Sequence, residues 1–233
     1  MIGPLSGSTA VVTGASRGIG RAIAMRLAEA GAEVALWARD STSLRVVASE
    51  ISAARGKARA IVVDVTDSDA VNQASDLVRA TMPPVRTIVN NAGVVLRKST
   101  EAITDAEWRR VMAVNLDGTF FVTRAFIPDL EHNQGRVINI SSISGREGTS
   151  LLAAYCAAKH GVVGLTRALA EELRAAKVCV NAICPGSVDT TMLREGMPGA
   201  RPDMSPDDIA KTALFLATAA PQALTGACID VFG

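Results

Sequence analysis

The chain has 233 residues, and its 48% of hydrophobic residues suffice for the core of one large α/β domain. Its 24 basic and 23 acidic residues nearly balance and form no runs, which excludes a nucleic-acid-binding surface and a polybasic membrane patch. No apolar run approaches the roughly 18 residues that read as a membrane span, and the first residues do not follow a secretory signal pattern. We therefore expect a cytoplasmic protein.

The residue types that usually bind metals are few and scattered. The chain has 4 cysteines and 2 histidines, without C-x-x-C spacing or a nearby pair of histidines. We expect free thiols and no metal site.

Apolar, β-branched runs alternate along the chain with amphipathic helical patterns. In chain order, we expect a strand at 9–13, a helix at 21–30, a strand at 33–37, a helix at 43–54, a strand at 58–63, a helix at 68–81, a strand at 87–89, a helical region at 105–130, a strand at 135–140, a helix at 153–176, a strand at 178–183, a helix at 206–219 and a strand at 227–231. The alternation predicts a single-domain, Rossmann-like α/β fold across residues 1–233. Its doubly wound parallel sheet has about seven strands, with helices on both faces.

Two helix starts carry recognisable capping residues. Thr104 followed by Glu107 forms a capping box, and Ser205 precedes a proline and two aspartates at the start of the helix at 206–219. The segment at about 191–205 is rich in glycine and proline, and we expect it to be a short loop beside the substrate.

The first strand runs into a glycine-rich turn, Gly14-Ala-Ser-Arg-Gly-Ile-Gly20, which leads directly into a helix. Glycine allows a positive φ and a close approach of the backbone to a pyrophosphate, and the helix N-terminus presents free amides. Because strand, turn and helix follow in this order, the turn predicts a dinucleotide phosphate site. Its spacing, G-x-x-x-G-x-G, differs from the G-x-G-x-x-G fingerprint.

The end of the second strand often selects the adenosine ribose, since an acid accepts from a free 2′-hydroxyl and an arginine pairs with a 2′-phosphate. Here Ala38 stands where an acid is expected, Arg39 follows it, and Arg17 lies in the glycine turn. Two guanidiniums favour NADP(H). In the alternative, Arg39 is solvated and Asp40 reaches the ribose or caps the next helix, which would allow NAD(H).

Tyr155 and Lys159 stand four residues apart in Y-C-A-A-K, so both side chains project from one face of the predicted helix at 153–176. A phenol with a pKa of about 10 is a poor acid or base near neutrality, but an ammonium one turn away favours phenolate and lowers that pKa. The pair therefore predicts an acid/base centre. The alternative is an aromatic residue and a solvated charge on a helix surface.

Further motifs occur with these in a characteristic order. They are T-G-A-S-R-G-I-G at 13–20, Asp64-Val65 after the third strand, Asn90-Asn91-Ala92-Gly93 after the fourth, Asn115, Ser142, Y-C-A-A-K and Pro185-Gly186. With this order, and with Ser142 thirteen residues before Tyr155, the chain resembles the short-chain dehydrogenase/reductase family over almost its whole length. Within the family it is most similar to 3-oxoacyl-[acyl-carrier-protein] reductases and related ketoreductases.

The resemblance implies a catalytic set of four residues. Tyr155 would protonate the carbonyl oxygen in reduction and act as the base in oxidation, and Ser142 would hydrogen-bond that oxygen. Lys159 would lower the tyrosine pKa and hold the nicotinamide ribose, and Asn115 would support a water chain leading away from Lys159. The alternatives are that Ser141 replaces Ser142, and that Asn115 is an ordinary residue at a helix kink.

The resemblance also places the cofactor along the glycine turn and the strand ends. The residues it implies are Gly14, Ser16, Arg17, Gly18, Ile19, Gly20, Arg39, Asp64, Val65, Asn91, Ala92, Gly93, Tyr155, Lys159, Pro185, Gly186, Val188 and Thr190. Asp64 and Val65 would contact adenine, and Thr190 would hold the carboxamide or a phosphate. For Asn90 and Asn91, the alternative is that their side chains satisfy the backbone of the turn.

These residues together predict an NADP(H)-dependent carbonyl reductase or secondary alcohol dehydrogenase acting on a small-molecule or carrier-bound carbonyl, with 3-oxoacyl thioesters as one class. An NAD-dependent alcohol dehydrogenase is the alternative within the family, and a non-catalytic dinucleotide-binding regulatory protein is the alternative from another class. The family commonly has a longer helical lid than segment 191–205, so we expect a more open cleft. It often forms homotetramers through the helices that carry Asn115 and Tyr155, so a homotetramer or homodimer is expected.

Overall fold

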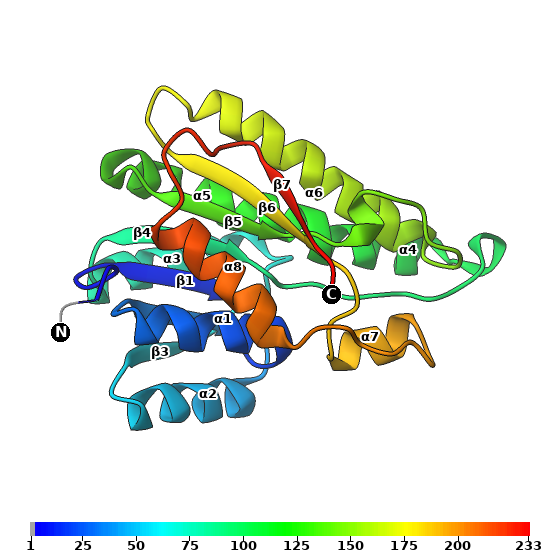
Figure 1. Ribbon diagram of the computed structural model, residues 1–233, viewed down its shortest axis with the longest axis horizontal. Helices are drawn as coiled ribbons and strands as arrows, with labels where there is room; N and C mark the ends of the chain where they lie inside the picture. Colours follow the sequence, from blue (N-terminus) through cyan, green and yellow to red (C-terminus); the bar gives the residue numbers. More distant parts are fainter. Residues whose placement is uncertain (1–2) are drawn as a thin grey trace.

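The computed structural model describes residues 3–233, which contain a seven-stranded sheet with helices on both faces (Figure 1). The strands are β1 (Thr9–Thr13), β2 (Glu33–Ala38), β3 (Lys57–Val62), β4 (Val85–Asn90), β5 (Arg136–Ile140), β6 (Cys179–Pro185) and β7 (Cys228–Val231). They lie in the order β3-β2-β1-β4-β5-β6-β7, and every neighbouring pair is parallel. The predicted α/β class and the parallel sheet are confirmed.

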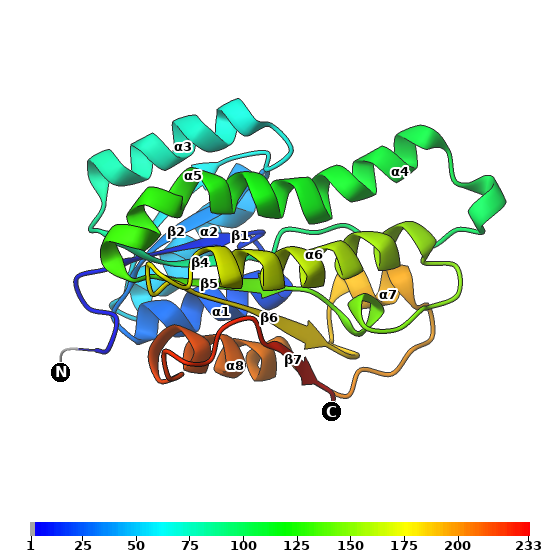
Figure 2. The same cartoon turned by 90° about the horizontal axis from the view of Figure 1, so that it is seen from above.

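Two helical layers enclose this sheet. The helices are α1 (Gly18–Glu29), α2 (Ser41–Ala53), α3 (Ser68–Thr81), α4 (Asp105–Met112), α5 (Gly118–Asn133), α6 (Ala153–Glu172), α7 (Thr191–Gly196) and α8 (Pro206–Thr218), with short η1 (Thr100–Ala102), η2 (Ala113–Asp117) and η3 (Ile143–Gly145) segments. Helices α1, α2 and α8 cover one face, and α3, α5 and α6 cover the other (Figure 2). Because both faces are covered, the strands are almost entirely apolar.

The order of the strands reverses at β1, which pairs with β2 on one side and with β4 on the other. In open parallel sheets, a ligand binds in the crevice outside the carboxyl ends of the strands at such a switch point. The segments that follow β1, β4, β5 and β6 are therefore the ones that the fold brings together. They contain nearly all of the predicted site residues.

The helical region expected at 105–130 is two helices separated by η2, which is a π-helical segment. Asn115 lies within η2, and its Nδ2 donates to the carbonyls of Val94 and Val111, each at 2.9 Å. Insertions of this type concentrate at functional sites. The interpretation of Asn115 as a kink residue and its predicted place near the site are therefore compatible.

The segment 191–205 is not a loop throughout, because its first part forms α7. Thr190 caps this helix, with its Oγ1 accepting from the Leu193 amide at 3.2 Å. Helix α6 ends at Glu172 rather than at 176. The following residues turn into β6, and Lys177 takes a φ of +58° there.

Both predicted helix caps are confirmed. Thr104 and Glu107 form a reciprocal capping box at α4, as do Ser205 and Asp208 at α8, where Pro206 occupies the first helical position. Such caps satisfy amides that otherwise have no partner at a helix start. Within residues 3–233, none of the helices combines the length and the hydrophobicity needed to cross a membrane.

Candidate active site

The glycine turn between β1 and α1 has no room for a side chain at Gly14 or Gly20. Gly14 and Gly18 have φ values of +63° and +55°, which disfavour any other residue. A Cβ on Gly20 would lie 2.3 Å from the Gly14 carbonyl oxygen. Arg17 is the N-cap of α1 but makes no capping bond with its side chain. Within residues 3–233, no side-chain cap therefore competes with an anion for the amides of the first turn of α1.

Thr13 and Asn91 hold this turn against the end of β4. The Asn91 Nδ2 donates to the carbonyls of Thr13 at 3.0 Å and Gly14 at 3.2 Å. In return, the Thr13 Oγ1 accepts from the Asn91 and Ala92 amides, each at 3.0 Å. Asn91 thus satisfies turn backbone, as its alternative interpretation held, while still lining the cleft. Thr13 was not predicted as a site residue, although it stands immediately before the first glycine.

At the end of β2, the side chain of Asp40 is used by α2. Its Oδ1 accepts from the Thr42 amide at 3.0 Å and the Ser43 amide at 3.4 Å, and its Oδ2 accepts from the Ser43 hydroxyl. The Ser43 hydroxyl and then the backbone amides hold the pKa of Asp40 below its usual value. Asp40 is therefore the cap that one of the two alternatives described, and its carboxylate faces α2.

The guanidiniums of Arg17 and Arg39 remain available to bind an anion near the end of β2. Arg39 has a side chain that is 63% exposed, and its nearest carboxylate contact is Asp64, with Nη1 and Oδ2 4.0 Å apart. Arg17 is also exposed and lines the same cleft. Asp64 accepts from the Thr66 amide and hydroxyl, which fixes the turn that follows β3.

The other end of the cleft holds the predicted acid/base residues. Tyr155 and Lys159 project from α6 and are 8% and 4% exposed, and the Lys159 Nζ lies 5.6 Å from the centroid of the tyrosine ring. The Nζ donates to the Ile140 carbonyl at 2.8 Å. Ser142 follows β5 directly and accepts from the Ser144 amide at 3.1 Å, and its hydroxyl lies close enough to Tyr155 to lower the pKa of the phenol.

Burial dominates the titration of both residues. It raises the pKa of Tyr155 to about 12, and the hydrogen bond from Ser142 opposes that shift. It also lowers the pKa of Lys159 to about 8. The net shift of the phenol pKa is thus upward, opposite to the direction expected from the ammonium alone, because desolvation of the phenolate is the largest effect.

Asn115 lies behind this pair. Its Oδ1 is buried and, within residues 3–233, has no hydrogen-bond partner. A Cβ on Gly93 would lie 2.8 Å from that oxygen and 3.7 Å from the Lys159 Nζ, so the three groups border one small space. A buried acceptor without a partner is costly, and such atoms commonly bind an ordered water.

A single cleft of about 1020 Å³ joins the two ends. The predicted residues that line it are Gly14, Ser16, Arg17, Gly18, Ile19, Arg39, Asp64, Val65, Asn91, Ala92, Gly93, Ser142, Tyr155, Lys159, Pro185, Gly186, Val188 and Thr190. Gly20 and Asn115 are the two that do not, since Gly20 packs beneath the glycine turn and Asn115 lies behind Lys159. These residues fit a dinucleotide, because the glycine turn offers a side-chain-free cradle at one end and ionisable groups at the other.

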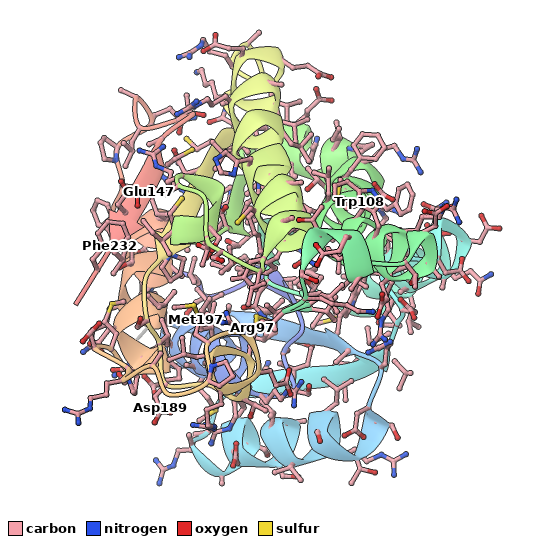
Figure 3. The ribbon with its side chains drawn as sticks, turned by 90° about the vertical axis from the view of Figure 1, so that its right-hand side faces the viewer. Arg97, Trp108, Glu147, Asp189, Met197 and Phe232 are labelled. Atoms are coloured by element: carbon pink, nitrogen blue, oxygen red, sulfur yellow. The ribbon has the colours of Figure 1, made fainter. Side chains whose placement is uncertain are left out.

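Helix α7 closes one side of the cleft near Tyr155. The Met192 Sδ lies 4.0 Å from the Tyr155 hydroxyl, a contact that the sequence pattern of segment 191–205 does not indicate. Gly196 sits against Val95, where a Cβ would come within 2.9 Å of Cγ2. Figure 3 shows Arg97 beside Met197 at this edge, and the Arg97 Nη1 donates to the Gly196 carbonyl at 3.4 Å.

The fold and the cleft define a nucleotide-dependent oxidoreductase of the Rossmann-like type, and comparison with known proteins identifies the family. Residues 8–199 match the family described as short chain dehydrogenase. The 3-oxoacyl-[acyl-carrier-protein] reductase of Chlamydia trachomatis is 36% identical over 246 residues, covering 100% of this chain and 99% of the relative. A galactitol 2-dehydrogenase (L-tagatose-forming) of Cereibacter sphaeroides is 38% identical over 249 residues, covering 98% and 95%.

Solved structures are similar over the same extent. A putative NAD(P)-dependent gluconate 5-dehydrogenase from Beutenbergia cavernae, with bound NADP at low occupancy, has a TM-score of 0.89 at 38% identity, covering 98% of this chain and 97% of that one. A putative gluconate dehydrogenase from Agrobacterium tumefaciens has a TM-score of 0.92 at 31% identity, covering 97% and 95%. The chain belongs to the short-chain dehydrogenase/reductase family and is an NAD(P)-dependent oxidoreductase.

Proposed function

We propose that this chain is an NADP(H)-dependent carbonyl reductase and secondary alcohol dehydrogenase. The observation that carries the proposal is that one cleft has a phosphate cradle with two arginines at one end and Ser142, Tyr155 and Lys159 at the other. A dinucleotide laid along this cleft would place its adenosine near Arg39 and its nicotinamide near Tyr155. The order of the strands supports that direction, because the two halves of such a cofactor bind on either side of the switch point.

Selection of NADP(H) rests on charges at the adenosine end. The Asp40 carboxylate already accepts from the amides at the start of α2, so a 2′-hydroxyl would have to compete with that cap for it. Arg17 and Arg39 are exposed and line the cleft, and guanidinium is well suited to a phosphate. The NADP in the similar structure from Beutenbergia cavernae is consistent with this choice.

NADPH, when bound, supplies the hydride that reduces the carbonyl carbon. The Tyr155 hydroxyl gives its proton to the carbonyl oxygen, and the Ser142 hydroxyl donates a hydrogen bond to the same oxygen as charge develops on it. Lys159 keeps a positive charge beside the phenolate that remains, and so favours its formation. In alcohol oxidation the phenolate takes the proton back.

Reprotonation of Tyr155 needs a path from solvent. The Lys159 Nζ and the Asn115 Oδ1 border the same small space, and that oxygen is a buried acceptor for which the described residues supply no donor. A water held there would link Lys159 to the π-helical segment and carry a proton inward. Asn115 thereby acts through Lys159 and not on the substrate.

The walls beside Tyr155 favour a substrate with an apolar group next to its carbonyl. The lining side chains from the segments after β4 and β5 and from α7 include Val94, Val95, Leu152, Met192 and Met197. Asp189 and Arg194, the charged residues of α7 and its approach that line the cleft, pair with each other at 2.7 Å. A sugar acid would find few partners here, whereas a 3-oxoacyl thioester would bury its chain.

The exposed aromatic residues of α4 and α5 support self-association. Trp108 and Phe120 are 41% and 39% exposed, and the Arg124 guanidinium stacks on the Phe120 ring at 5.0 Å. Large apolar groups held at a surface in this way commonly mark a protein interface. We expect a homotetramer or homodimer, and sedimentation at micromolar concentration tests it, since a monomer would contradict the expectation.

The function is tested by following NADPH and NADH absorbance across a panel of ketones and alcohols, with 3-oxoacyl thioesters and keto-sugar acids as the two extremes. We expect reduction of 3-oxoacyl thioesters with NADPH, and a lower kcat/KM for the sugar acids and for NADH. Tight binding of NADPH without turnover of any member would instead favour a regulatory role. Turnover with NADH alone would make the chain an NAD-dependent dehydrogenase.

A further inference from the structure

Helix α6 carries both Tyr155 and Lys159, yet its own start does little to fix it. Leu152 is the N-cap and makes no side-chain hydrogen bond, and the first turn holds no acidic residue. Tyr155 lies in that first turn, where an uncapped helix frays and slides most readily. The position of the catalytic pair therefore depends on contacts along the sides of α6.

Consecutive residues at the end of β5 make such contacts with the side of α6. The Ile140 carbonyl accepts from the Lys159 Nζ at 2.8 Å, and the Ser141 Oγ donates to the Lys159 carbonyl at 3.0 Å. The Ser142 hydroxyl, next along the chain, lies close enough to Tyr155 to lower the pKa of the phenol. Ile140 thus holds the side chain of Lys159, and Ser141 holds its backbone.

The bond from Ser141 is buried and closely enclosed. Ser141 is 3% exposed, and a Cβ on Gly145 would lie 2.4 Å from its Oγ and 2.7 Å from the Lys159 carbonyl oxygen. On another side of α6, a Cβ on Gly161 would lie 2.8 Å from the Leu116 Cδ2. Glycines on both sides let η3 and η2 close onto the helix at the level of Lys159.

The Lys159 carbonyl does not need Ser141 as a partner. It lies well inside α6, where the helical ladder already gives each carbonyl an amide four residues ahead. A second donor from a strand end therefore adds a lateral restraint and does not rescue an unpaired group. The restraint joins the strand that presents Ser142 to the helix that presents Tyr155.

We propose that Ser141 is a positioning residue. Through its bond to the Lys159 carbonyl, the Ser141 hydroxyl sets the position of Lys159 and Tyr155 along the axis of α6 relative to Ser142. The proposal rests on the proposed function, in which these three side chains act on one carbonyl oxygen. It assigns separate tasks to the two serines of the Ser141-Ser142 pair. The second touches the substrate and the first holds the helix.

The chain has a single tyrosine, so NMR of ring-labelled tyrosine observes Tyr155 directly, without any turnover. The ionisable groups closest to it are Lys159 and Cys156, with Cys184 behind Lys159. If Ser141→Ala lets Lys159 and Tyr155 shift by about 1 Å relative to Ser142, the ring resonances of Tyr155 should move in spectra taken at neutral pH, because the surroundings of the ring change. A misplacement of that size also lowers kcat about 10-fold or more.

The matched control is Ser75→Ala, which removes another buried hydroxyl bonded to a carbonyl, Ser75 Oγ to Asn72 O at 2.7 Å, on α3. We expect both readouts to shift in Ser141→Ala, to stay at wild-type values in Ser75→Ala, and to return in Ser141→Thr, which keeps the hydroxyl. Unchanged ring resonances and an unchanged kcat in Ser141→Ala, or equal changes in the control, would overturn the proposal. A wild-type chain without turnover would refute the proposed function instead, and the ring resonances would still report on Ser141.

Discussion

Replacing Arg39 by alanine tests the choice of nucleotide. Its side chain is 63% exposed, and its nearest carboxylate contact is Asp64 at 4.0 Å, a separation at which an exposed ion pair contributes at most about 1 kcal/mol. A charged hydrogen bond to a 2′-phosphate contributes about 1.5–3 kcal/mol. The variant should therefore bind NADPH about 10- to 150-fold more weakly.

NADH lacks the 2′-phosphate, so its Kd should change by less than about threefold in the same variant. Calorimetric titration of both nucleotides measures the two effects, and Arg45→Ala, which removes an exposed guanidinium of α2 away from the cleft, is the control. The reasoning would be refuted if NADPH and NADH were weakened equally. It would also be refuted if NADPH bound with wild-type affinity.

Two further predictions concern the cradle and the cap of α4. Gly20→Ala places a Cβ 2.3 Å from the Gly14 carbonyl oxygen, so the unfolding temperature should fall by several degrees and stabilisation by NADPH should be lost. Gly148→Ala, where a Cβ meets nothing within 4 Å, should behave as wild type in the same thermal scans. The Lys98 ammonium and then the Thr104 amide and hydroxyl lower the pKa of Glu107 from 4.5 to about 2. The ionised Glu107 therefore contributes its full stabilisation above pH 4.5, and this stabilisation is lost as the pH falls through about 2. The difference in unfolding temperature between wild type and Glu107→Gln should narrow over that range, and a constant difference would contradict this assignment.

The sequence correctly predicted the features for which the local residue pattern and the order of elements along the chain indicate the same structure. Each strand is a short apolar run, and the sheet follows from their alternation with helices. The glycine turn is recognisable because residues 14, 18 and 20 satisfy backbone demands that no other residue type meets. Thr104 and Ser205 marked helix starts correctly because a cap is a local hydrogen bond.

The features that escaped prediction depend on contacts between distant segments. The π-helical segment at Asn115 is held by the Val94 carbonyl, which is far away in sequence. Helix α7 forms in a segment rich in glycine and proline because Thr190 caps it and Gly196 packs on Val95. The pKa of Tyr155 was expected to fall because Lys159 is close along the helix, but burial by the surrounding segments decides the sign.

Local pattern also left the use of Asp40 open, since an aspartate after a strand suits a ribose and a helix cap equally well. Its bonds to the amides of Thr42 and Ser43 decide in favour of the cap. Similarly, the spacing to Tyr155 favoured Ser142 over Ser141. In the structure the Ser141 hydroxyl is bonded to the Lys159 carbonyl, while the Ser142 hydroxyl lies close enough to Tyr155 to lower its pKa, and this difference supports the predicted choice of Ser142.

Tyr155→Phe is the most direct test of the central claim, because it removes a single hydroxyl from a residue that is 8% exposed and leaves the packed ring in place. NADPH affinity should stay within about threefold of wild type, while kcat for the best ketone of the panel should fall at least about 100-fold. The two quantities are measured on the same preparation by nucleotide titration and NADPH oxidation. Turnover at the wild-type rate would contradict the account, since the proton would then come from a group other than Tyr155.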